Sequence, residues 1–129
     1  MNSHFKPVCV WLIALAVFGA NNPAYATGTQ GIGLSEAYVN RLADAIYKAE
    51  GGAKTRHPYG ILAKYKHTTP RQACINTIRS KWKAWQAAGA KGDYLAYLGS
   101  KYAPVGAAND PTGLNRNWVK NVRYHMGEP

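Results

Sequence analysis

The chain has 129 residues and a formal net charge of +10, because 16 Lys and Arg face 6 Asp and Glu. This charge favours association with anionic polymers such as cell-wall material, anionic lipid or nucleic acid, but it does not separate an enzyme from a binding protein. The 2 cysteines, Cys9 and Cys74, are too few for a disulfide framework or a cysteine-based zinc site.

Residues 1–26 have the pattern of a secretory signal peptide. Lys6 supplies positive charge, residues 8–20 form an uninterrupted apolar run, and residues 24–26 (Ala-Tyr-Ala) match a cleavage site. The run is too short to cross the bilayer's apolar core, which is about 30 Å thick. We therefore expect export to the periplasm or the cell exterior, without stable membrane insertion after removal of the signal peptide. A short membrane anchor is the alternative.

Residues 27–34 are predicted to be a flexible, glycine-rich lead, and residues 35–129 a single domain. Ser35 is suited to cap a first helix. Gly51-Gly52 is expected to end that helix. Its apolar residues recur at helical spacing, and they are Val39, Leu42, Ala43 and Ile46.

Three further helices are predicted. Thr69-Pro70 is typical of a helix start, and that helix should run to about Gly89 with Cys74 as a small buried hydrophobic residue. Asp93 is suited to cap a short third helix, and Asn115 a last one.

Residues 53–66 are basic and are interrupted by Pro58 and Gly60. This composition predicts a loop that contains a short extended or hairpin segment at residues 59–65. The expected fold class is therefore mainly α, with a short extended segment after the first helix.

Glu50 is the strongest candidate for catalysis. At about 100° per residue it lies close to Val39 and Ala43 around the helix, on the apolar side, whereas Asp44 lies on the far side and should be solvated. Partial burial and the negative end of the helix dipole both disfavour the charged form of Glu50. We therefore expect a raised pKa, which suits a general acid. An ordinary helix end, with Gly51 as its left-handed cap, is the alternative.

The sequence around Glu50 contains a recognisable pattern, in which Ala49-Glu50-Gly51-Gly52 is followed by His57-Pro58-Tyr59-Gly60-Ile61. This pattern resembles the lysozyme-like superfamily, most closely its small lytic transglycosylases and phage-type muramidases. The resemblance implies a lysozyme-like α+β fold and a peptidoglycan-cleaving enzyme with Glu50 as its catalytic acid. It also implies a set of substrate contacts, which are Tyr59, Gly60, Ile61 and either Tyr97 or Tyr102. Gly51 replaces the serine usual in transglycosylases, which leaves the branch open.

The lytic transglycosylases that the chain resembles use one glutamate as acid and then base, leaving a 1,6-anhydromuramoyl end. Hydrolytic glycosidases commonly need two carboxyl groups. Asp93 and Asp110 are the candidates for a second one, although a helix cap and a turn are their simpler roles. The sequence predicts no cofactor and no metal; a zinc site built from His57, His67 and His125 is the alternative.

Peptidoglycan strands are the expected partner, and the resemblance implies recruitment by a secretion or conjugation apparatus or by phage machinery. The competing hypothesis is a non-catalytic, secreted basic protein that binds envelope polymer or nucleic acid. It requires only the charge and the aromatic residues. Trp82, Trp85 and Trp118 lie on apolar helix stripes and are predicted to pack in the core.

Overall fold

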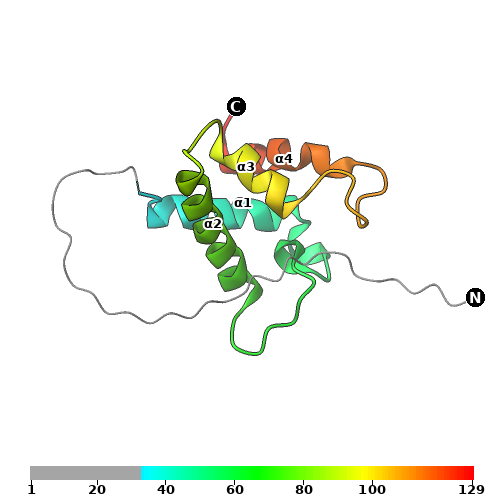
Figure 1. Ribbon diagram of the computed structural model, residues 1–129. Coiled ribbons are helices and arrows are strands. Elements are labelled where there is room, and N and C mark those ends of the chain that lie inside the picture. Colours follow the sequence, from blue (N-terminus) through cyan, green and yellow to red (C-terminus); the bar gives the residue numbers. More distant parts are fainter. Residues whose placement is uncertain (1–32) are drawn as a thin grey trace, which may run out of the picture.

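The computed structural model describes residues 33–129 (Figure 1). The predicted signal peptide and residues 27–32 of the predicted lead lie outside the described residues. The α-helices are α1 (Glu36–Ala49), α2 (Pro70–Ala87), α3 (Tyr94–Tyr102) and α4 (Trp118–Met126). Three short 3-10 turns, η1 (Gly52–Lys54), η2 (Pro58–Gly60) and η3 (Leu114–Asn117), connect them. The prediction of a mainly α chain is confirmed.

Side-chain caps begin the first three helices at the predicted residues. Ser35 accepts a hydrogen bond from the Tyr38 amide at 3.1 Å, and Thr69 accepts one from the Gln72 amide at 3.1 Å. Asp93 accepts one from the Ala96 amide at 2.8 Å. Each bond satisfies a backbone amide that lacks a partner within its helix. Because both partners are close in sequence, these helix starts could be predicted from the sequence.

The predicted start of the last helix is wrong. Asn115 lies inside η3 and its side-chain amide donates to the Pro104 carbonyl at 3.0 Å. The helix α4 begins at Trp118 instead, and its N-cap residue, Asn117, makes no side-chain capping bond. The last helix is thus preceded directly by a 3-10 turn that contains Asn115, and Asn115 uses its side-chain nitrogen to bond the preceding loop.

Helix α1 is the centre of the domain. Figure 1 shows it running through the middle, with α2 crossing it and with α3 and α4 above it in this view. Its buried residues are Val39, Leu42, Ala43, Ala45 and Ile46, which include the whole predicted apolar stripe. Cys74 of α2 is fully buried within the same core, as predicted. Burial of this stripe on both sides removes apolar surface from water and stabilises the arrangement.

The segment between α1 and α2 contains the predicted loop, and Ile61 is extended, but no hairpin forms because the part of the chain that the structure describes contains no strand. Tyr59 and Gly60 adopt left-handed conformations, with φ of 61° and 66°. The chain therefore curls into η2, where the Gly60 amide donates to the His57 carbonyl and the Ile61 amide to the Pro58 carbonyl. The positive φ values are incompatible with a strand.

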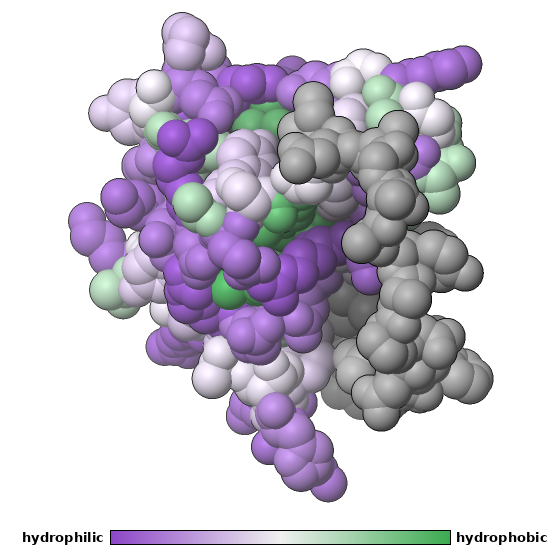
Figure 2. Space-filling model, turned by 90° about the vertical axis from the view of Figure 1, so that its left-hand side faces the viewer, coloured by the Kyte–Doolittle hydropathy of each residue, from purple (hydrophilic) through white to green (hydrophobic). Residues whose placement is uncertain are grey.

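Figure 2 shows a largely hydrophilic face on which apolar residues form only small areas. Among the described helices, none has both the length and the apolar character needed to cross a membrane.

Candidate active site

Glu50 caps the C-terminal end of α1, directly before Gly51, which adopts a left-handed conformation with φ of 100°. The backbone is therefore an ordinary glycine-terminated helix end. The side chain is partly buried, and burial raises the pKa of the Glu50 carboxyl above its ordinary value. By contrast, Asp44 of the same helix is exposed. Both findings agree in direction with the expectation from helical geometry.

Trp118 is the hydrogen-bond partner of Glu50. Its indole Nε1 donates to Oε1 of the carboxyl at 2.7 Å, across 68 residues of sequence. This bond lowers the pKa of Glu50, but the effect of burial is larger. The sequence predicts Trp118 as a core residue, and the structure confirms that it is buried. Its second role was missed, although a buried indole N–H generally requires an acceptor.

Gly60 of η2 lies directly against the Glu50 carboxyl. A Cβ atom built at Gly60 would lie 2.8 Å from Oε2 and 2.9 Å from Cδ, both closer than van der Waals contact allows. The carboxyl is thus held between the indole of α4 and the backbone of η2. The family resemblance predicts Gly60 as a substrate contact; the structure places it in a tight turn, with its backbone against Glu50.

Two of the predicted substrate-binding tyrosines, Tyr59 and Tyr102, pack within the protein next to this site. Tyr59 is buried, with its ring 5.1 Å from that of Tyr47. The Tyr102 hydroxyl donates to the Tyr59 carbonyl at 2.6 Å, and its ring stacks on Trp118 at 5.2 Å. Both rings are therefore packed against other rings of the protein, and the Tyr102 hydroxyl is engaged by the backbone of η2.

The other two predicted contacts differ in position. Ile61 follows η2 directly and packs against the core while partly exposed. Tyr97 lies on α3, and the Lys101 ammonium lies 5.7 Å from its ring centre. Ile61 therefore directly follows Gly60 in sequence, whereas Tyr97 makes no hydrogen bond to Glu50 and no ring stacking with Trp118.

The acidic residues other than Glu50 are all engaged by cations or by backbone amides. Ion pairs join Glu36 to Arg79, Asp44 to Arg71, Asp93 to Arg123, and Glu128 to Arg41 and Arg123. The buried Asp110 accepts hydrogen bonds from the amides of Gly106 and Asn115. Within residues 33–129, Glu50 is the one acidic side chain whose partner is a neutral side-chain donor.

These contacts bear on the two candidates for a second catalytic carboxyl. Asp93 caps α3 and pairs with Arg123 at 2.7 Å. Asp110 is only 5% exposed and holds the loop before η3 through its two amide contacts. Both carboxylates therefore have structural roles, in agreement with the simpler interpretation of each.

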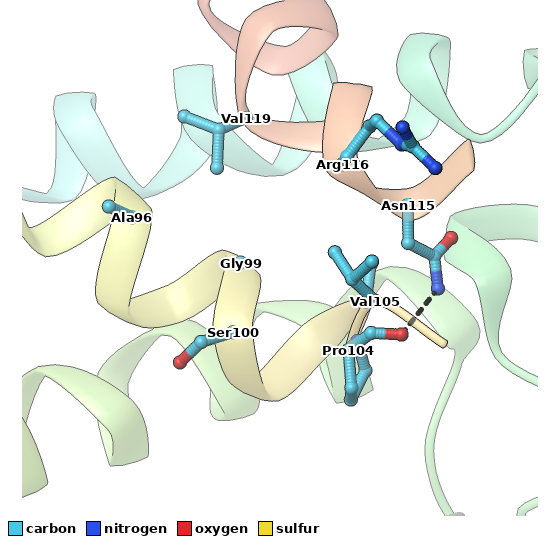
Figure 3. Close-up of a pocket in the computed structure, with 9 residues that line it drawn as sticks. Ala96, Gly99, Ser100, Pro104, Val105, Asn115, Arg116 and Val119 are labelled. Atoms are coloured by element: carbon cyan, nitrogen blue, oxygen red, sulfur yellow. Dashed lines mark hydrogen bonds between the residues drawn. The ribbon is translucent and has the colours of Figure 1, made fainter. Parts of the chain in front are cut away.

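A hollow of about 480 Å³ lies elsewhere, between α3, η3 and the loop that joins α3 to η3 (Figure 3). It is lined by small and apolar groups, among them Gly99, Val105 and Val119, with Arg116 and Asn115 at one end. None of the predicted site residues lines it. In the described residues, no group of three or more His, Cys, Asp or Glu side chains is placed to hold a metal ion.

Comparison with known protein families, curated proteins and solved structures finds no match to this chain. The case for a function therefore rests on the Glu50 site. A carboxyl whose pKa is raised by burial holds its proton to higher pH than a solvated one. Such a group, partly open to solvent, is suited to donate a proton to a bound molecule and then to take one back.

Proposed function

We propose that this chain is an exported, lysozyme-like enzyme that cleaves the glycan strands of peptidoglycan, between N-acetylmuramic acid and N-acetylglucosamine, with Glu50 as general acid and base. The main support for the proposal is that no cation acts on the Glu50 carboxyl. In a chain of net charge +10, burial and the Trp118 indole are the influences on its pKa, and no cation is among them. A nearby Lys or Arg would stabilise the carboxylate and oppose the protonated form that a general acid requires.

A one-glutamate reaction fits the inventory of carboxyl groups better than a two-carboxylate reaction. Glu50 protonates the glycosidic oxygen as the bond to the anomeric carbon breaks. The resulting carboxylate then removes the proton from the 6-hydroxyl of the muramoyl residue, whose oxygen closes onto the anomeric carbon. The product is a 1,6-anhydromuramoyl end, and Glu50 regains its proton. Since Asp93 and Asp110 are engaged in structural contacts, a lytic transglycosylase is the branch that we favour.

The proposal places the protein in the periplasm or outside the cell, with peptidoglycan as its substrate. Local opening of the wall would serve a secretion or conjugation apparatus or a phage, and such machinery is the partner that we propose. The lysozyme-like classification of the helical domain belongs to the same proposal.

A second candidate is a non-catalytic protein that binds anionic envelope polymer or nucleic acid. One observation favours it: Lys54, Arg56, Lys64 and Lys66 are exposed and make no ion pair within the described residues. These cations lie between α1 and α2, in a stretch without acidic residues. Such a surface attracts polyanions whether or not Glu50 reacts.

The deciding experiment compares the purified protein with Glu50→Gln on isolated peptidoglycan, with released fragments analysed by mass spectrometry. Asp44→Asn is the matched control, because it removes an exposed carboxylate from the same helix. We expect anhydro-ended fragments from the wild type and Asp44→Asn, and none from Glu50→Gln. Reducing ends would identify a hydrolase instead. Absence of fragments, together with salt-dependent sedimentation with peptidoglycan, would favour the binding protein.

A further inference from the structure

Tyr102 lies where the two elements that hold the Glu50 carboxyl meet. Its hydroxyl donates to the carbonyl of Tyr59, at 2.6 Å, within the turn η2 that brings Gly60 against Glu50. Its ring stacks at 5.2 Å, with an interplanar angle of 26°, on the Trp118 indole that donates to Glu50. One side chain at the end of α3 thus contacts both neighbours of the carboxyl.

The turn η2 requires such a restraint. Tyr59 adopts a left-handed conformation with φ of 61°, which is disfavoured for L residues other than Asn and Asp. The carbonyl that accepts from Tyr102 belongs to this same residue. A hydrogen bond at that point opposes relaxation of the turn, and relaxation would move Gly60 away from Glu50.

The donor that makes this bond is protonated under all ordinary conditions. Burial raises the pKa of the Tyr102 hydroxyl far above its usual value, and the groups facing it are Cys74 of α2, Tyr59 of η2 and Glu50. Burial also raises the pKa of the Cys74 thiol, to about 12, so this neighbour stays neutral. The hydroxyl therefore remains a donor throughout the range in which Glu50 titrates.

We propose that Tyr102 is a positioning residue for Glu50: it fixes η2 through the Tyr59 carbonyl and fixes the indole of Trp118 by stacking. This inference rests on the proposed function for its catalytic consequence, although the positioning itself is measurable without activity. The proposed role of Tyr102 is thus to position Glu50, in place of the substrate contact that the family resemblance implies.

The test compares Tyr102→Phe with Tyr94→Phe. Tyr94 is a matched control on the same helix, because its buried hydroxyl donates to the Ile78 carbonyl at the same distance, 2.6 Å, among Trp82 and Trp85 and away from Glu50. Both variants keep their ring and lose one hydrogen bond from a tyrosine hydroxyl to a backbone carbonyl, part-buried at Tyr102 and buried at Tyr94. General destabilisation should therefore affect them alike.

The decisive readout is the titration of Glu50, followed by NMR through its side-chain carboxyl carbon and the Trp118 indole proton. In Tyr102→Phe we expect the titration midpoint to fall towards that of a solvated glutamate, because η2 no longer excludes water from the carboxyl. In Tyr94→Phe it should stay at the wild-type value. Equal midpoints in all three proteins would overturn the part of the proposal in which the Tyr102 hydroxyl positions Glu50 through η2.

Release of peptidoglycan fragments gives the catalytic consequence. Tyr102→Phe should lose roughly tenfold or more in rate through misplacement of the acid, with Tyr94→Phe at the wild-type rate. An unchanged Tyr102→Phe rate would overturn the catalytic part. If the wild type itself releases no fragments, the proposed function fails while the NMR titration still decides the positioning role.

If Tyr102→Phe does not fold, amide hydrogen exchange in the wild type tests the proposal instead. The amides of Gly60 and Ile61 should be protected to the same degree as the amide of Ala103, which bonds to the Gly99 carbonyl at the end of α3. Exchange of the two turn amides at the rate of an unprotected loop would show that Tyr102 does not hold η2.

Discussion

Gly60→Ala tests the geometry of the Glu50 site directly. The new Cβ would lie 2.8 Å from Oε2 and 2.9 Å from Cδ of Glu50. To restore ordinary contact, the carboxyl oxygen would have to move by about 0.6 Å. Such a movement pushes the carboxyl against or away from the Trp118 indole, whose hydrogen bond measures 2.7 Å.

Two terms contribute to the expected loss of stability. The first is conformational: an L residue at the Gly60 φ of 66° costs roughly 1–2 kcal/mol. The second is the steric term, for which overpacking costs about 1–3 kcal/mol. Gly106→Ala isolates the first term, because Gly106 has a φ of 74° and its Cβ would meet nothing within 4 Å. We therefore expect a loss of about 2–5 kcal/mol for Gly60→Ala against about 1–2 kcal/mol for Gly106→Ala.

Urea unfolding followed by tryptophan fluorescence measures both free energies, and the Trp118 indole proton resonance reports on the hydrogen bond to Glu50. We expect that resonance to shift in Gly60→Ala and to stay unchanged in Gly106→Ala. Losses that agree within about 0.5 kcal/mol, the usual scatter for substitutions without a specific mechanism, would refute the close contact between Gly60 and Glu50.

Two further predictions concern the protonation of Glu50. Trp118→Phe removes the indole donor and should raise the pKa of Glu50 further, since that bond lowers it; an unchanged or lower titration midpoint by NMR would contradict this. The raised pKa also makes the folded state bind a proton that the unfolded state has released. The contribution of Glu50 to stability is thus fully present below its unfolded pKa, near 4.3 in model peptides, and is lost as the pH rises through the folded pKa. As the pH rises from the unfolded pKa to the folded pKa of Glu50, the free energy of unfolding of the wild type should therefore fall relative to that of Glu50→Gln. If the free energies of the two proteins change in parallel with pH, Glu50 does not contribute in this way.

Local sequence was sufficient for much of the fold. The helix starts at Ser35, Thr69 and Asp93 were readable because each cap bonds an amide three residues away in its own helix. The exposed position of Asp44 and the partly buried position of Glu50 followed from helical periodicity in the same way. Such features depend on residues within one or two helical turns, so no knowledge of the rest of the chain is needed.

The segment between α1 and α2 contains a tight turn, at Tyr59 and Gly60, that the sequence did not predict. Its composition suggested an extended or hairpin segment, but Tyr59 adopts a left-handed conformation that a tyrosine rarely takes. The hydroxyl of Tyr102, 43 residues away, donates to its carbonyl. Local propensity is a weak guide where a distant side chain compensates for an unfavourable backbone conformation.

By itself, the sequence determined that the described part of the chain is mainly α and that Glu50 stands at the end of its first helix on the apolar side. Only the tertiary structure decided what surrounds that carboxyl. The indole of Trp118 comes from 68 residues away and Gly60 from a tight turn. Helix caps and apolar stripes are set by neighbours along the chain, whereas the environment that raises a pKa is created by packing between elements that share no local pattern.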